Sequence, residues 1–232
     1  MKLNIVLLAY EEYENLRILI PEIKKYTRND DFDIKIIVVG KNEGDRNTSE
    51  LCKRLDTTFI HRAPGNTFGD ALRSGLEYSE DSDWVIVMDA DGSHNPKYLP
   101  TFIDKISENT SDLIIGSRYV KGGATDNPFV LILLSKILNL VYSIYLKLDI
   151  KDVSNNFRAY KTKQISSIEL VEENFEIVEE ILVKLIHNVQ NLSVYEIPIR
   201  FEKRMLGDSK RKFIIFVFTL TSTLLKLKKY KK

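Results

Sequence analysis

The sequence contains almost no cysteine and almost no net charge. Cys52 is the only cysteine among 232 residues, which excludes an intrachain disulfide framework and indicates a reducing compartment. The formal net charge of +1 gives the molecule no overall field that would attract nucleic acid. Basic residues gather at the end of the chain, without the aromatic residues of a nucleic-acid-binding sheet face, so we expect no nucleic-acid partner.

Long apolar runs are also missing. The first one, residues 3–9, ends at Glu11 and Glu12, too early for the core of a secretory signal. No segment reaches the roughly 20 apolar residues of a membrane-spanning helix. A hydrophobic content of 44% and a charged content of 29% are ordinary for a globular protein. We therefore expect a cytoplasmic protein built mainly from one large domain.

Strand and helix patterns alternate through the first half of the chain. Short apolar, β-branched runs predict strands over residues 3–8, 34–39, 57–60, 84–88 and 112–115. Helical periodicity predicts helices over residues 12–26, 48–55, 67–78 and 97–108. This alternation predicts an α/β fold with a mostly parallel central sheet and flanking helices.

Two carboxylates, Asp89 and Asp91, directly follow the predicted strand over residues 84–88. Open α/β sheets bind ligands at the edge where the strands end. Magnesium and manganese ions are often held there by one or two protein carboxylates together with substrate phosphates. The pair therefore predicts a metal-bridged diphosphate, with a simple polar turn after the strand as the alternative.

Two segments of the second half are unusually apolar. Over residues 131–148, a mostly apolar helix carries one narrow polar stripe formed by Ser135, Asn139, Ser143 and Lys147, with Lys136 beside it. Such a helix is either buried or lies against a membrane. Residues 213–225 are uncharged and flanked by basic residues. We expect them to contact a membrane surface, with a packed C-terminal helix as the alternative.

Four segments stand in a fixed order along the chain. They read MDADGSHNP at 88–96, IGSRYVKGG at 115–123, DVSNNFRAY at 152–160 and EIPIRFEKRMLGDSK at 196–210. From about Leu3 to Lys210 the chain resembles the family 2 glycosyltransferases of GT-A fold. Within that family it is similar to the dolichyl-phosphate mannosyltransferase-like branch, which glycosylates polyprenyl phosphates.

The resemblance implies a domain organisation and an activity. Residues 1–210 would form a GT-A domain containing the amphipathic acceptor and membrane helix over 131–148, and residues 211–232 would be a membrane-proximal segment. The enzyme would move a hexose, mannose or glucose, from GDP-mannose or a UDP-hexose to a polyprenyl (dolichyl-type) phosphate. The transfer would invert the sugar configuration, require Mg²⁺ or Mn²⁺, and take place at the cytoplasmic face of the membrane.

The resemblance also implies roles for individual residues. The metal ligands would be Asp89 and Asp91. The nucleotide-binding positions would be Ala9, Tyr10, Glu12, Gly40, Asp89 and Ala90. The acceptor phosphate would meet Arg118, Ser135, Arg204 and Ser209. The catalytic group would comprise Asp91, Arg118, Arg204 and Lys210, with residues 204–210 forming a mobile flap over the phosphates.

The chain departs from the family pattern at three places. Gly40 and Lys41 stand where the family usually has two aspartates, one of which contacts the donor nucleoside; Asp45 is a possible substitute. An arginine that the family carries just before Ser135 is absent. Asn156 replaces a glycine. These changes leave the donor and the acceptor open.

Two other functions remain compatible with the sequence. A saccharide acceptor would require a general base, for which Asp152, Glu179 and Glu180 are the candidates. A catalytically silent nucleotide-sugar binder is the second alternative, because Gly40 and Lys41 remove a carboxylate from the nucleoside site. A phosphate acceptor is already an anionic nucleophile and needs cationic positioning rather than a strong base.

Overall fold

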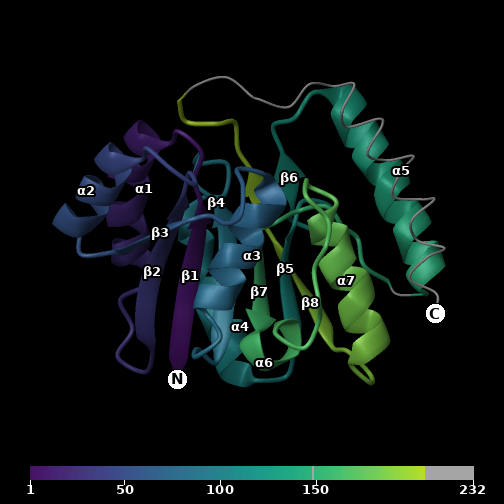
Figure 1. Ribbon diagram of the computed structural model, residues 1–232. Helices are drawn as coiled ribbons and strands as arrows, with labels where there is room; N and C mark the ends of the chain where they lie inside the picture. Colours follow the sequence, from purple (N-terminus) through teal and green to yellow (C-terminus); the bar gives the residue numbers. More distant parts are fainter. Residues whose placement is uncertain (148, 207–232) are drawn as a thin grey trace.

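The computed structural model describes residues 1–147 and 149–206 (Figure 1). Its strands are β1 (Lys2–Leu8), β2 (Asp33–Gly40), β3 (Thr58–His61), β4 (Trp84–Asp89), β5 (Leu113–Ser117), β6 (Ala124–Thr125), β7 (Arg158–Lys161), β8 (Val194–Pro198) and β9 (Arg200–Phe201). One sheet has the order β3-β2-β1-β4-β7-β5-β8, and β6 pairs with β9. Within the large sheet β7 runs antiparallel to β4 and β5, whereas the other pairings are parallel. The predicted mostly parallel sheet is thus confirmed.

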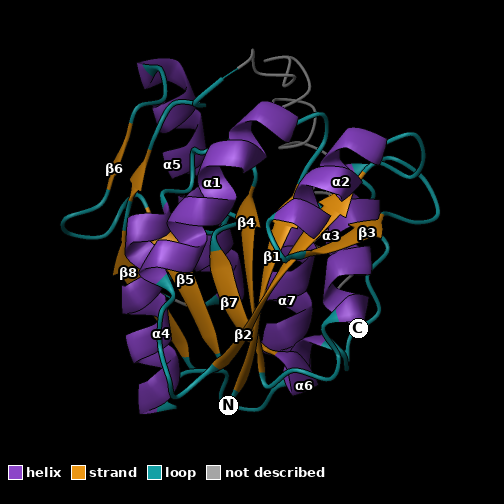
Figure 2. Ribbon diagram, turned by 90° about the vertical axis from the view of Figure 1, so that its left-hand side faces the viewer, coloured by secondary structure: helices purple, strands orange, loops and turns teal. Residues whose placement is uncertain are grey.

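Helices cover both faces of this sheet (Figures 1 and 2). They are α1 (Tyr13–Tyr26), α2 (Arg46–Arg54), α3 (Phe68–Tyr78), the 3₁₀ turn η1 (Pro96–Tyr98), α4 (Leu99–Glu108), α5 (Phe129–Leu146), α6 (Thr162–Ile165) and α7 (Ile177–Asn188). Buried side chains of α1, α2 and α4 form a core with one face of the sheet. Those of α3, α5, α6 and α7 form a second core with the other face. The protein is therefore a three-layer α/β structure.

Strand β1 shows why the sheet requires both layers. Leu3, Ile5 and Leu7 belong to the core on the α1 side, whereas Val6 and Leu8 belong to the core on the α3 side. Successive side chains of a strand point to opposite faces, so an uninterrupted apolar run must be covered twice.

The carboxyl ends of three strands meet where the strand order reverses. Leu8, at the end of β1, pairs with Val39 of β2 on one side and with Asp89 of β4 on the other. The chain has moved outward from β1 to β3 and then returns to the opposite side of β1 to form β4. Such a switch point opens a crevice at the carboxyl edge of the sheet, which brings the segments after β1, β2 and β4 together.

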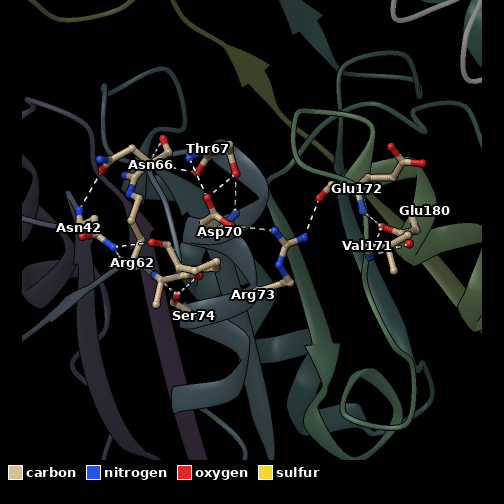
Figure 3. A network of polar contacts seen from close by, with 12 residues as sticks. Asn42, Arg62, Asn66, Thr67, Asp70, Arg73, Ser74, Val171, Glu172 and Glu180 are labelled. Carbon is tan, nitrogen blue, oxygen red and sulfur yellow. Dashed lines mark hydrogen bonds and ion pairs between the residues drawn. The ribbon is translucent and has the colours of Figure 1, made fainter.

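A polar network joins α3 to the loop before α7 (Figure 3). The hydroxyl of Thr67 accepts from the Asp70 N–H at 3.1 Å, and Asp70 Oδ2 accepts from the Thr67 N–H at 2.9 Å. Arg73 then links Asp70 Oδ1 at 2.9 Å to the carbonyl of Glu172 at 2.7 Å. Burial alone would raise the pKa of Asp70, but its hydrogen bonds with Thr67 and Arg73 outweigh burial and lower that pKa. The network fixes the start of α3 beside the sheet edge.

Helix α5 begins and ends two residues earlier than predicted. No described side chain caps its first turn, which follows Pro128. The residue after its last one, Lys147, has a φ of 55°, in the left-handed region, and stops the helix. Among the described residues, no helix combines the length and the apolarity needed to cross a bilayer.

Candidate active site

The two predicted metal carboxylates both lie at the carboxyl edge of the sheet, at the end of β4. Asp89 ends β4, and its Oδ1 accepts from Asn156 Nδ2 at 3.2 Å. Asp91 Oδ1 accepts from the backbone N–H of Ser93 at 2.9 Å and from its hydroxyl at 2.6 Å. The side chains of Asp89 and Asp91 are 26% and 17% exposed, so both reach solvent at the crevice.

This donor set fits a metal ion that arrives with a substrate. In the described part of the chain, no group of three or more His, Cys, Asp or Glu side chains could hold a metal by itself. Two solvent-accessible carboxylates match the way Mg²⁺ is bound together with substrate phosphates. Asp89 and Asp91 would hold the ion, which when bound neutralises charge that develops on a departing diphosphate.

A buried histidine fixes the loop that carries the carboxylates. The backbone N–H of Asp89 donates to His94 Nδ1 at 2.9 Å, and His94 Nε2 lies 3.0 Å from Asn155 Oδ1. Because Nδ1 accepts, the ring proton belongs on Nε2, which donates to Asn155. The ring is fully buried and stacks on Phe157 at 5.0 Å between centroids. This role of His94 was not predicted, although His94 stands within the first matched segment.

The predicted nucleotide residues gather beside the carboxylates. The N–H of Ala9 donates to Val39 at 3.0 Å, and that of Ala90 donates to Leu8 at 3.3 Å. Tyr10 is 37% exposed, and its ring lies 5.7 Å from Lys41 Nζ. An exposed ring beside fixed strand ends offers a surface on which a base can stack.

The end of β2 has no space for a side chain at residue 40. A Cβ on Gly40 would lie 2.4 Å from the Phe59 ring and 2.7 Å from Asp45 Oδ2. Asp45 Oδ2 also accepts from the backbone N–H of Lys41 at 3.2 Å. The carboxylate of Asp45 therefore lies next to the position from which the family's aspartate would extend. Lys41 Nζ pairs with Glu11 at 3.2 Å.

Arg62 lies at the candidate site, although the sequence did not point to it. Its buried guanidinium donates to the carbonyls of Gly40 at 2.8 Å, of Asn66 at 3.3 Å and of Ala9. Burial lowers the pKa of Arg62. The guanidinium joins the ends of β1 and β2 through carbonyl oxygens distant in sequence, so no local pattern could have revealed it.

On the other side of the carboxylates, Arg118 is held by Asp152. Arg118 Nε and Nη2 each donate to the carboxylate at 2.7 Å, and Nη2 also donates to Ser154 Oγ at 2.8 Å. Burial alone would lower the pKa of Arg118, but the charge and hydrogen bonds of Asp152 outweigh burial and raise it. Arg118 is therefore a permanent cation in a fixed orientation.

The polar stripe of α5 faces the body of the protein. Ser135 and Asn139 are each 5% exposed, and Asn139 Oδ1 accepts from the Val153 N–H at 3.1 Å. Ser143 is half-buried, and Lys147 lies beyond the helix, exposed. The exposed large apolar side chains of this helix are Phe129, Val130, Leu133, Ile137, Leu140 and Ile144, and Lys136 is exposed among them. Apart from Lys136, the helix is thus polar inward and apolar outward.

The start of the predicted flap crosses the carboxyl edge. Arg204 pairs with Glu12 Oε1 and lies 3.4 Å from Asp91 Oδ2. Glu12 Oε2 also accepts from Asn15 Nδ2 at 2.6 Å, so Glu12 is engaged from both sides. The predictions for Ser209, Lys210 and residues 211–232 lie outside the described residues.

The comparisons with known proteins bear on the whole chain. Residues 4–168 match glycosyl transferase family 2. The dolichol-phosphate mannosyltransferase of Pyrococcus furiosus is 34% identical over 218 residues, covering 91% of this chain and 60% of that relative. The polyprenol monophosphomannose synthase of Mycolicibacterium smegmatis is 30% identical over 220 residues, covering 89% of this chain and 79% of that relative. The chain thus spans about three fifths of the first relative's length.

Solved structures show the same fold at lower identity. The Mycobacterium tuberculosis glucosyl-3-phosphoglycerate synthase, in complex with Mn²⁺, UDP and glucosyl-3-phosphoglycerate, superposes with a TM-score of 0.73 at 15% identity. The match covers 97% of this chain and 79% of that one. This likeness confirms the GT-A architecture, and the family match together with the two relatives confirms the resemblance. The chain belongs to glycosyl transferase family 2.

Proposed function

We propose that this protein transfers a hexose, with mannose favoured, from a nucleotide diphosphate sugar to a polyprenyl phosphate. The observation that carries the proposal is the coupling of Arg118 to the polar face of α5. Asp152 fixes Arg118 in a two-pronged ion pair, and the next residue, Val153, donates to Asn139 of α5. A permanent cation and buried polar groups therefore lie together on the acceptor side of Asp89.

The chemistry needs positioning more than proton transfer. An oxygen of the acceptor phosphate forms the new bond to the anomeric carbon, while the bond from that carbon to the donor diphosphate breaks. The electron pair leaves with the nucleotide diphosphate, and attack from the opposite face inverts the anomeric configuration. Arg118 and Arg204 would hold two anionic groups close together. Arg118 would do so through Nη1, because its Nε and Nη2 already donate to Asp152, whereas the guanidinium of Arg204 can donate paired hydrogen bonds.

The candidate bases for a saccharide acceptor are engaged elsewhere. Asp152 is fully buried and uses both carboxylate oxygens to hold Arg118. Glu180 accepts from the N–H groups of Val171 and Glu172 and from Lys184 Nζ at 2.7 Å. Glu179 adds its negative charge near Arg118, where it further supports the cation. These arrangements favour a phosphate acceptor over a sugar hydroxyl.

The donor side supports a nucleotide with a mannose or another hexose. GDP-mannose and a UDP-hexose are the two donors we consider, and the names of the two curated relatives favour mannose. Tyr10 would stack on the base or ribose. Asp45 would supply the carboxylate that Gly40 lacks, because its Oδ2 lies 2.7 Å from the Cβ position of residue 40.

The acceptor would be reached at a membrane surface. A helix that is polar inward and mainly apolar outward can rest on a bilayer by its apolar side, with the exposed Lys136 reaching the headgroups, while Ser135 and Asn139 would line the acceptor side. The basic residues at the chain end would be attracted to anionic headgroups. We therefore propose peripheral association with the cytoplasmic face of the membrane, with residues 1–210 as the catalytic domain.

The test has a binding step and a transfer step. Titration calorimetry with GDP, UDP and their hexose conjugates, with and without Mn²⁺, identifies the donor. Transfer of labelled sugar from that donor to a polyprenyl phosphate in detergent or vesicles then tests the acceptor. We expect Asp91→Asn to abolish both metal-dependent steps, and the exposed control Asp81→Asn to leave them intact. Transfer to a free saccharide alone, or binding without any transfer, would contradict the proposal.

A further inference from the structure

Residues 201–205, which lead into the predicted flap, are joined to the loop that carries Asp89 and Asp91. His94 forms a bridge with Phe201, the N–H of Glu202 donates to the carbonyl of Ser93 at 3.0 Å, and that of Met205 donates to the carbonyl of Asp91 at 3.0 Å. The side chain of Met205 covers Gly92 so closely that an added Cβ would lie 2.3 Å from its sulfur. Arg204 is therefore held over the carboxylates by its neighbours on both sides.

The two oxygens of Asp91 have different partners. Oδ1 accepts both hydrogen bonds from Ser93, whereas Oδ2 faces Arg204 Nη1 at 3.4 Å. Oδ2 is thus the oxygen that the loop leaves to a metal ion, and a guanidinium already lies beside it. The same guanidinium also pairs with Glu12. Arg204 therefore neutralises two carboxylates: Asp91 at the proposed metal position and Glu12 at the proposed nucleotide position.

We propose that Arg204 is a built-in counter-ion that a divalent cation must displace from Asp91. A metal ion at Asp91 and a nucleotide at Glu12 would together free the guanidinium from both carboxylates and leave it available for the anionic acceptor on the same edge of the sheet. Donor loading would then precede, and cause, the release of the Arg204 side chain for acceptor binding. The inference rests on the proposed function in assuming that Asp91 binds a metal ion.

The proposal predicts that removing the arginine strengthens metal binding. In the full chain without nucleotide, we expect Arg204→Gln to bind Mn²⁺ roughly three- to tenfold more tightly than the wild type, measured by electron paramagnetic resonance of free Mn²⁺. Arg204→Lys, which retains the charge, should stay within about twofold of the wild type. Lys203→Gln removes the same charge from an exposed neighbour and controls for the general field.

Each outcome decides the proposal. Tighter Mn²⁺ binding in Arg204→Gln alone supports it, including the case in which only that variant binds measurably. Equal or weaker binding in Arg204→Gln, absence of binding in both proteins, or equal tightening in Lys203→Gln overturns it. The proposed function is judged separately by wild-type sugar transfer, which can succeed whether or not Arg204 competes with the metal.

Discussion

At the scale of single residues, three arginines near the sheet edge have different partners and therefore different freedom. Arg62 donates to backbone carbonyls at the ends of β1 and β2, so it is part of the frame. Arg118 is fixed by one buried carboxylate. Arg204 is shared between two carboxylates that a nucleotide and a metal would also use. Of these three arginines, only Arg204 is paired with carboxylates that the expected nucleotide and metal ion would also bind.

Arg118→Lys tests whether orientation matters as well as charge. Lysine keeps the cation but cannot reproduce the two-pronged pairing with Asp152 together with the bond to Ser154. We expect the KM for polyprenyl phosphate to rise about tenfold or more, with little change in the KM for the donor. Steady-state kinetics with each substrate varied separately measures this split.

A matched control uses another arginine. Arg200 pairs with Asp126 at 2.6 Å, but its side chain is 56% exposed. Arg200→Lys should therefore change neither KM by more than about twofold. An equal effect of the two substitutions would show that Arg118 has no special role in orienting the acceptor.

The hydrogen bonds of Asp70 should contribute to the free energy of unfolding, and this contribution should be lost in acid. The pKa of Asp70 is lower in the folded protein than in the unfolded chain, so its stabilising effect is present above about pH 4 and is lost as the pH falls through the folded pKa. Near pH 7, Asp70→Asn should lower the free energy of unfolding by roughly 1–2 kcal/mol and Tm by about 4 °C.

Thermal unfolding of Asp70→Asn and wild type between pH 7 and pH 3 measures this effect. The difference in Tm should shrink as the solution becomes more acidic, because the wild-type carboxylate becomes protonated. A difference that stays constant across this range would contradict the linkage and leave only a change in packing.

At the scale of elements, the first half of the chain was predictable because its patterns are local. The apolar run over residues 34–39 and the helical spacing of apolar residues in α1 predict from the sequence alone which residues are buried. The structure places both elements within about two residues of the predicted bounds. Strand β7 was missed because four residues, Arg158–Lys161, carry no periodicity. Its antiparallel place between β4 and β5 is decided by tertiary packing alone.

The site divides in the same way. Asp89 and Asp91 were predicted because strand ends and adjacent carboxylates are visible in the sequence. Arg118 and Asp152 are paired although they lie 34 positions apart in the sequence. The hydrogen bonds that join Asp89 to His94 and His94 to Asn155 connect Asp89 to a residue that lies still farther away in the sequence. Such partners depend on which strands become neighbours, so sequence patterns named Asp89, Asp91 and Arg118 as candidates but not the residues that hold them.

The exposed apolar side chains of α5 predict that the protein binds to vesicles through this helix. Ile144 is 70% exposed, so Ile144→Glu should leave Tm almost unchanged. The substitution should lower the partition coefficient onto phospholipid vesicles about tenfold or more, since it removes apolar contact and adds a charge. Vesicle flotation measures this change.

The control is an exposed isoleucine on another element. Ile18 of α1 is 46% exposed, and Ile18→Glu should not alter flotation. If Ile144→Glu also had no effect, α5 would not be the part of the protein that meets the bilayer.

At the scale of the whole molecule, the near-zero net charge conceals a basic end. Replacing Lys226, Lys228, Lys229, Lys231 and Lys232 with glutamine should weaken binding to anionic vesicles by roughly 1 kcal/mol per lysine that lies near the surface. Binding to neutral vesicles and sugar transfer to a detergent-solubilised acceptor should change little. Flotation at two lipid compositions separates these contributions, and equal losses on both would argue against an electrostatic role.

The reversed direction of β7 has a consequence for the whole molecule. A parallel strand delivers its last residues to the carboxyl edge, but β7 delivers the residues that precede it. That single stretch contributes Asn156 to Asp89, Asn155 to His94 and Asp152 to Arg118. The proposed donor side and the proposed acceptor side thus share one short piece of backbone. A shift of that backbone would move both sides together, so this one segment would set the distance between the two substrates.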